Sequence, residues 1–306
     1  MLSGVADASS ATTRNGRRAW GHRIMTGTRK LGLIGVFGFG IVAIFCVAAA
    51  IGPVAVGSSV DRIAAPPFLH PGGGGFLFGT DELGRSELAR VIVASRIAIV
   101  AAFGSVVCGL VLGVAMGVIA AYVGGVVDQV LGRLMDFIFG FPSYVLPILI
   151  AVVLGSGLWV ACFSIGLTFS PQFGRISRTA TLNVRHRAYV SVAKLSGRSS
   201  QWIIFRHILP NIIGPLAVMV GLSLANAEGS YAVLAYLGYG VAPPAPDYGS
   251  MLSDAQVFML NDSWAVLFPC IALVLLVLGF VFIGDWLRER FDPRGEIRFG
   301  RGVSGQ

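Results

Sequence analysis

Long stretches without a charged side chain constrain this chain more than any other feature. Each is longer than the roughly 20 helical residues that cross a hydrocarbon core about 30 Å thick. The composition agrees, because only 12% of the residues are charged, whereas soluble domains have roughly a quarter. The stretches are Leu31–Val60, Ile97–Val127, Phe137–Gly174, His207–Pro246 and Ser263–Gly284, and only the fourth contains an acid, Glu228.

These stretches predict an all-α integral membrane protein with six transmembrane helices. Phe137–Gly174 is too long for one crossing, and the LGSG at 154–157 is where we expect the chain to turn. The predicted transmembrane domain covers 31–285, between a basic N-terminal tail at 1–30 and a C-terminal tail at 286–306. The spans are expected near 31–56, 97–122, 131–153, 158–174, 211–237 and 263–285.

The basic residues predict which side of the membrane each loop faces. The net charge is +8, and 19 of the 23 Lys and Arg fall on one side of the six-span arrangement. Cytoplasmic loops carry such an excess, so we expect both termini and the loop 175–210 in the cytoplasm. The positive charge is therefore topological, and we do not expect nucleic acid as a partner.

Several kinds of catalytic and metal site are missing. A Walker A motif is impossible, because neither Lys30 nor Lys194 follows a glycine, as that phosphate-binding loop requires. HExxH and GxSxG are absent too. The four cysteines lie in apolar stretches without CxxC spacing, and we interpret them as small core residues. We expect no catalytic site, no metal and no cofactor bound by this chain.

Two acids lie within or beside predicted spans. Asp136 is three residues after Arg133, and we expect these side chains to form an i,i+3 pair. Glu228 lies about one helical turn beyond the centre of the fifth span, where a carboxylate must face protein or water rather than lipid. Two interpretations stay open for Glu228: a hydrogen-bonded carboxyl that stabilises helix packing, or a polar group that lines a solute path.

A basic, acid-free insert at 186–210 interrupts the apolar sequence. Its local pattern predicts a helix over 188–196, a left-handed Gly197 and a second helix capped by Ser199 or Ser200. The insert could lie on the bilayer surface, with its arginines near anionic membrane lipid. Apolar residues of the second helix repeat at helical spacing up to Pro210, where we expect it to end; they are Trp202, Ile203, Phe205, Ile208 and Leu209.

This insert resembles the EAA loop of ABC-importer permeases. The family pattern is Glu-Ala-Ala, three residues, Gly, nine residues, then Ile-x-Leu-Pro. The insert keeps that spacing but has Ser for Glu, Val for the first Ala and His207 for Ile. The matching positions are Ser191, Val192, Ala193, Gly197, Leu209 and Pro210.

Other stretches resemble the dipeptide and oligopeptide branch of these permeases, which also includes nickel importers. GTDELGR at 79–85 and LGYGVAPP at 237–244 together resemble its C-type subunit. The similarity runs from about residue 20 to 294. It also includes FRHILPN at 205–211, RLMDFIFGFP at 133–142 and GDWLRERFDP at 284–293.

The resemblance implies a type I ABC importer permease in a bacterial inner membrane. Its implied partners are a second, B-type permease, one or two cytoplasmic ABC ATPase subunits that use ATP and Mg, an extracytoplasmic solute-binding protein and a peptide substrate. The insert would then be the coupling helix that docks on the ATPase. The alternative function is a stand-alone channel or a secondary carrier, with Glu228 as the ion-coupling group.

Two outer segments also carry predictions. The sequence 79–92 is expected to form an amphipathic element on the outer membrane face before the second span, or simply to pack at the interface. The loop 237–262 contains Asp247, Asp254 and Asp262 and no basic residue. It could form an outer mouth that receives the binding protein, or it could be an ordinary connector.

Overall fold

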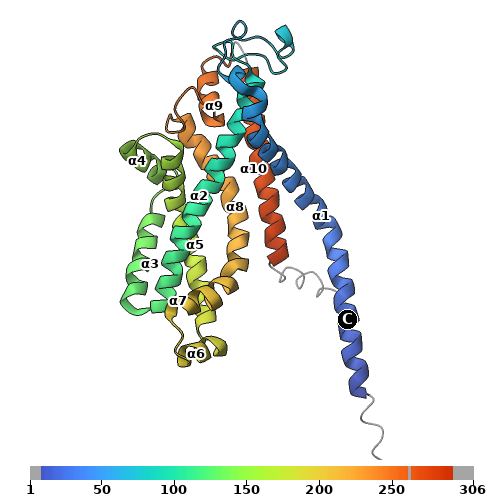
Figure 1. Cartoon of the computed structure of the whole chain (residues 1–306), viewed down its shortest axis with the longest axis vertical. Helices are drawn as coiled ribbons and strands as arrows, with labels where there is room; N and C mark the ends of the chain where they lie inside the picture. Colours follow the sequence, from blue (N-terminus) through green and yellow to red (C-terminus); the bar gives the residue numbers. More distant parts are fainter. Residues whose placement is uncertain (1–7, 261–262, 292–306) are drawn as a thin grey trace, which may run out of the picture.

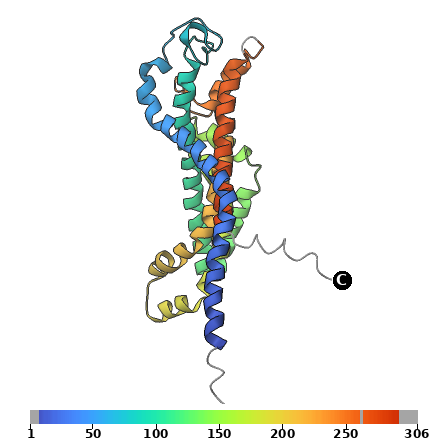
Figure 2. The same ribbon diagram turned by 90° about the vertical axis from the view of Figure 1, so that its right-hand side faces the viewer.

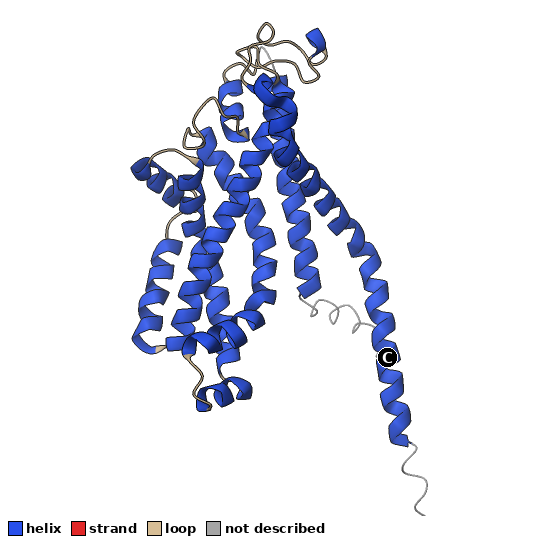
Figure 3. Ribbon diagram, in the orientation of Figure 1, coloured by secondary structure: helices blue, strands red, loops and turns tan. Residues whose placement is uncertain are grey.

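The computed structural model describes residues 8–260 and 263–291. The regular elements of this part of the chain are helices, joined by loops (Figure 3). Its β pairing is confined to an isolated bridge between Thr80 and Ser86. The all-α fold class is therefore confirmed. Asp262 and the end of the predicted C-terminal tail, 292–306, lie outside the described residues.

Four helices are long and apolar enough to cross a membrane. They are α1 (Ala8–Val56) from Gly32 onward, α2 (Glu87–Val123), the continuous helical stretch Ser200–Tyr236, which includes α8 (Leu209–Tyr236), and α10 (Trp264–Phe291). Helix α1 begins at Ala8 and so extends through most of the predicted N-terminal tail. The helix continues through the dipeptide Asn15-Gly16, although N-G dipeptides commonly mark turns.

Helices α2 and α5 (Leu158–Arg185) form the centre of the bundle. Gly109, Gly113 and Gly117 repeat every fourth residue along α2, on one face of that helix. A Cβ at Gly113 would collide with the backbone of Ser170 on α5. Small residues at this spacing let two membrane helices approach closely. This close packing is important for α5, because the second half of α5 contains arginines. Although α5 is long enough to cross a membrane, it is not apolar along its whole length.

The third predicted span is interrupted. The sequence predicts one helix near 131–153, whereas the structure has α3 (Gly125–Phe139) and α4 (Val145–Leu154) with a non-helical break between them. Pro142 lies in the break. Proline has no N–H and disfavours the helical conformation in the residue before it, so Pro142, two residues after Gly140, favours a break here.

The two ends of the bundle differ in what they carry. The insert, with α6 (Ala188–Leu195) and α7 (Ser200–Ile203), lies at the same end as the start of α1 (Figures 1 and 2). The opposite end carries two short 3-10 helices (Gly57–Val60 and Gly73–Gly75) and α9 (Tyr248–Gln256). The sequence assigned these two groups of segments to opposite sides of the membrane from charge alone.

Candidate coupling surface and outer charge cluster

The insert is a helix, a left-handed glycine and a second helix, as its sequence predicts. Gly197 has φ +74°. The amide of Arg198 donates to the carbonyl of Ala193 at 3.2 Å, which is the hydrogen bond that closes a glycine-terminated helix. Ser199 caps the next helix by accepting a hydrogen bond from the amide of Trp202 at 3.3 Å. Of the two candidate caps, the structure therefore selects Ser199.

Helix α6 separates a buried face from an exposed apolar ridge. Val190 is fully buried and Ala193 is 8% exposed, so these residues attach the helix to the bundle. Val192 and Leu195 are 61% and 89% exposed. Three residues apart, they lie on one side of the helix, and Tyr189 extends the ridge by another turn. Exposed apolar side chains gathered on one side of a helix are typical of an interaction surface.

Some of the positions matched to the EAA motif are exposed, and others pack against the bundle or shape the turn. Ser191 and Val192 face outward, Ala193 packs inward, and Gly197 shapes the turn. Tyr189 and Leu195 were missed by the motif comparison. Their signal was available in the sequence, because each lies three residues from Val192 in a segment predicted to be a helix.

Pro210 does not end the second helix, and that prediction is wrong. Helix α7 passes into a π turn, Ile204–Ile208, and then directly into α8, whose first turn contains Leu209 and Pro210. Proline is tolerated in the first turn of a helix, because the amides of that turn have no partner within the helix. The last two motif positions therefore join the insert to a membrane helix.

The insert is also fixed to the neighbouring helix ends. Arg185, at the end of α5, donates through Nη1 to the carbonyl of Ala121 on α2. The Lys194 ammonium lies 5.0 Å from the centre of the Tyr122 ring. Helix α6 is therefore held against the end of α2 as well as against α5.

Ion pairs between helices α3 and α5 correct one sequence interpretation. Asp136 pairs with Arg175 at 2.8 Å, so the expected pair with Arg133 is wrong. Arg178 binds both carboxylate oxygens of Asp128 at 2.6 Å. The acids of α3 face arginines about 40 and 50 residues away in sequence, because α5 packs along this face of α3.

At the opposite end, the segment 78–86 folds as a compact turn and not as an amphipathic helix. Helix α2 begins only at Glu87, with Ser86 as its cap. Gly79 and Gly84 both have positive φ, and a Cβ at either would collide with a backbone carbonyl, of Leu69 and Ala65 respectively. The expected separate surface element is therefore wrong, because two left-handed glycines stop the helical pattern.

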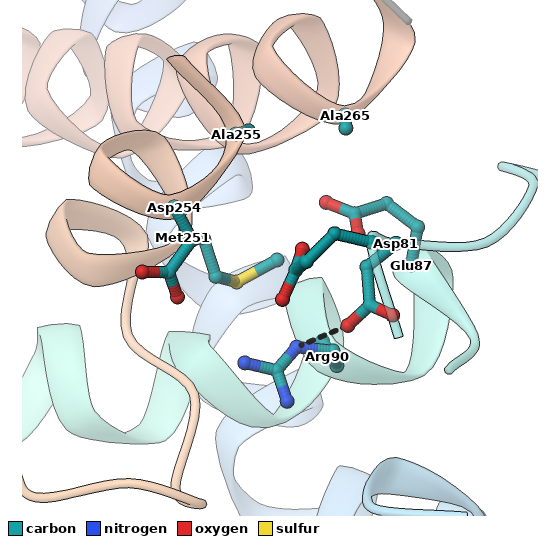
Figure 4. A pocket seen from close by; sticks show the side chains of 8 residues that line it. Asp81, Glu87, Arg90, Met251, Asp254, Ala255 and Ala265 are labelled. Atoms are coloured by element: carbon teal, nitrogen blue, oxygen red, sulfur yellow. Dashed lines mark ion pairs between the residues drawn. The ribbon is translucent and has the colours of Figure 1, made fainter. Parts of the chain in front are cut away.

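Asp81 organises a buried charge cluster at this end (Figure 4). Its Oδ1 accepts the Arg85 amide at 2.8 Å, and its Oδ2 accepts the Arg85 Nε at 2.6 Å. Arg90 on α2 is 4% exposed, and its Nε lies 3.4 Å from the same Oδ2. Helix α9 contributes Met251 and Asp254 to a small pocket beside this cluster. The i,i+4 spacing of Asp81 and Arg85 is visible in the sequence, but the burial of Arg90 depends on the tertiary contact with α9.

Asp247 attaches the outer loop to the bundle. Its Oδ1 caps α9 by accepting the Ser250 amide at 2.8 Å, and the residue is 1% exposed. Burial raises the pKa of Asp247, although hydrogen bonds from Ser250 oppose the shift. The hydroxyl of Tyr248 then donates to the carbonyl of Val91 on α2 at 3.1 Å. The predicted outer loop thus contains a helix fixed to α2.

Glu228 is 1% exposed, inside the packing of α8 against α2 and α5. Its Oε2 has no hydrogen-bond partner in the described part of the chain. The carboxyl therefore faces protein rather than lipid, as the sequence requires, but it does not line an open surface of this chain. The interpretation of all four cysteines as core residues is wrong for Cys46 and Cys270, which are exposed, whereas Cys162 is buried.

Comparisons with known proteins agree with this architecture. Residues 109–296 match the family model described as "Binding-protein-dependent transport system inner membrane component". The dipeptide transport system permease protein DppC of Alkalihalophilus pseudofirmus is 35% identical over 264 residues, covering 86% of this chain and 85% of that protein. The glutathione transport system permease protein GsiD of Pectobacterium atrosepticum is 33% identical, covering 71% and 72%.

A solved structure is similar in fold. It is a chain from inward-facing conformations of the MetNI methionine ABC transporter, with a TM-score of 0.53 and 17% sequence identity. The superposition covers 66% of this chain and 96% of that chain.

Proposed function

Because this chain belongs to the family of binding-protein-dependent transport system inner membrane components, we propose that it forms half of the translocation path of an ATP-driven peptide importer. The chain is a non-catalytic, multi-pass permease of the inner membrane, and its family works with ATPase and binding-protein partners. The relatives that share the most sequence include dipeptide permeases. The substrate class is therefore di- or oligopeptide, and a B-type permease supplies the other half of the path.

The exposed ridge of α6 carries this proposal. Val192 and Leu195 are exposed on α6, and α6 lies at one end of the molecule (Figure 1). An ATPase groove that buries this ridge would contact α6, which the Gly197 turn joins to α7, and α7 continues through the π turn into α8. ATP binding can favour one state of the path only through contacts that differ between states. The insert places such contacts at the base of a membrane helix.

The membrane arrangement that fits the family has six crossings. Five crossings are single helices: α1, α2, α5, α8 and α10. The third crossing along the chain consists of α3 and α4 together, with the break at Pro142 between them. Both termini and the insert face the cytoplasm in this arrangement. The segment 57–86 and α9 face the binding protein on the other side. ATP and Mg are used by the partner ATPases.

Stand-alone channel or carrier function is not supported. Family membership covers most of the chain, and the insert has no purpose in a channel without an ATPase. Glu228 is therefore not assigned an ion-coupling role.

The test is purification of a tagged chain from its own host in mild detergent, followed by reconstitution. ATPase subunits and a second permease should be recovered with it, and proteoliposomes should take up a labelled dipeptide only with Mg-ATP and binding protein. Leu195→Asp should abolish ATPase recovery. The matched control is Leu260→Asp, because Leu260 is 98% exposed at the opposite end. A lone chain, or equal effects of both variants, would contradict the proposal.

A further inference from the structure

The π turn Ile204–Ile208 is the one irregular step between the insert and the membrane helix α8. The amide of Leu209 donates to the carbonyl of Ile204, five residues back, where a regular α-helix pairs residues four apart. Pro210 has no amide proton. Short π segments inside helices occur frequently at functional sites, so this step calls for an explanation.

Asn211, which follows Pro210, makes a side-chain hydrogen bond back to the π turn. Its Nδ2 donates to the carbonyl of His207 at 2.6 Å. The side chain of Asn211 thus adds a hydrogen bond from the start of α8 back to a carbonyl within the π turn. Since Asn211 is exposed, its own burial does not explain the interaction.

His207 connects this turn to both helices of the insert. Its ring centre lies 5.5 Å from that of Tyr189 on α6 and 5.0 Å from that of Trp202 on α7. Ile203 and Ile208, on the two sides of the turn, are at most 1% exposed. The turn is therefore packed from several sides, and the carbonyl that Asn211 binds belongs to the residue that holds the two insert helices together.

We propose that Asn211 is a positioning residue that makes the π turn a fixed joint, so that movement of the docked insert passes to α8. This inference rests on the proposed function. Without the hydrogen bond to His207, the turn would bend or shift register and absorb part of the movement. The insert would still dock, because the ridge of Val192 and Leu195 is more than ten residues away in sequence and unchanged.

The experiment measures solute taken up per ATP hydrolysed in reconstituted complexes. Asn211→Asp keeps the size of the side chain but presents only acceptors to the carbonyl, and uptake per ATP should fall about fivefold, as expected for loss of one hydrogen bond. Asn211→Ser should restore coupling, because a serine hydroxyl can donate to the carbonyl four residues back. ATPase recovery should be normal in both variants.

Thr179→Val is the matched control. Thr179 Oγ1 donates to the Arg175 carbonyl at 3.0 Å, also four residues back and exposed, but within the regular helix α5. Normal uptake per ATP in Asn211→Asp, or loss of ATPase recovery in that variant, would overturn the inference while leaving the proposed function standing. Failure of the wild-type chain to couple uptake to ATP would instead contradict the proposed function.

Discussion

Replacing Gly197 by valine tests whether the turn of the insert sets the direction of the docking helix. The backbone of Gly197 has φ +74°, and nothing lies within 4 Å of the position where a Cβ would stand. The substitution therefore has a conformational cost and no steric one. A left-handed backbone costs a residue with a side chain about 1–2 kcal/mol, and a β-branched side chain more.

That cost would be relieved by straightening the turn, which misdirects the ridge of α6. A difference of about 1–2 kcal/mol changes a population by a factor of roughly 5 to 30. We expect Gly197→Val to reduce ATPase recovery and ATP-dependent uptake within this range. Membrane insertion and pairing with the second permease should be normal, because the insert lies outside the predicted spans.

Two further variants distinguish a misdirected α6 from a general effect of backbone strain on the protein. Gly197→Asn should retain most of the activity, because asparagine adopts the left-handed conformation more readily than other residues. Gly57→Val is the matched control at the opposite end, since Gly57 has φ +54° and equally open surroundings. ATPase activity and uptake are compared at equal expression. Normal coupling in Gly197→Val, or an equal loss in Gly57→Val, would refute the reasoning.

Four other predictions follow from the same structure. Single cysteines at Ala245 and Arg187, in a chain without its four native cysteines, should be labelled from opposite sides by an impermeant thiol reagent; labelling of both from outside would contradict the orientation. Glu228→Gln should keep the complex assembled and leave uptake unchanged if the carboxyl only packs, whereas altered uptake would restore a role in the solute path. Ser191→Glu should be tolerated, because Ser191 is exposed and the family pattern has Glu there; complete loss of ATPase recovery would show a site rebuilt around serine. Burial raises the pKa of Asp247 in the folded protein, so folding favours the protonated carboxyl. The free energy of unfolding is therefore highest below the ordinary carboxyl pKa of about 3.9, and it falls as the pH rises through the folded pKa. The melting temperature in detergent of Asp247→Asn should therefore exceed that of the wild type increasingly from acid to neutral pH, and a constant difference would contradict this.

Local signals in the sequence were sufficient for the helical class, for the division of the loops between two ends of the bundle and for the shape of the insert. Apolar length, basic bias and the glycine between two helices each act through neighbouring residues or through the membrane itself. The same is true of the cap at Ser199 and the left-handed Gly197. These features do not depend on which other helix lies nearby, so one chain sequence predicts them.

Only the tertiary structure decided what each polar or irregular residue does. Asp136 pairs with Arg175 and not with its sequence neighbour, because α5 lies along α3. Arg90 and Glu228 are buried because α9, α5 and α2 cover them. Such partners are distant in sequence, and their contribution depends on packing that no local pattern encodes.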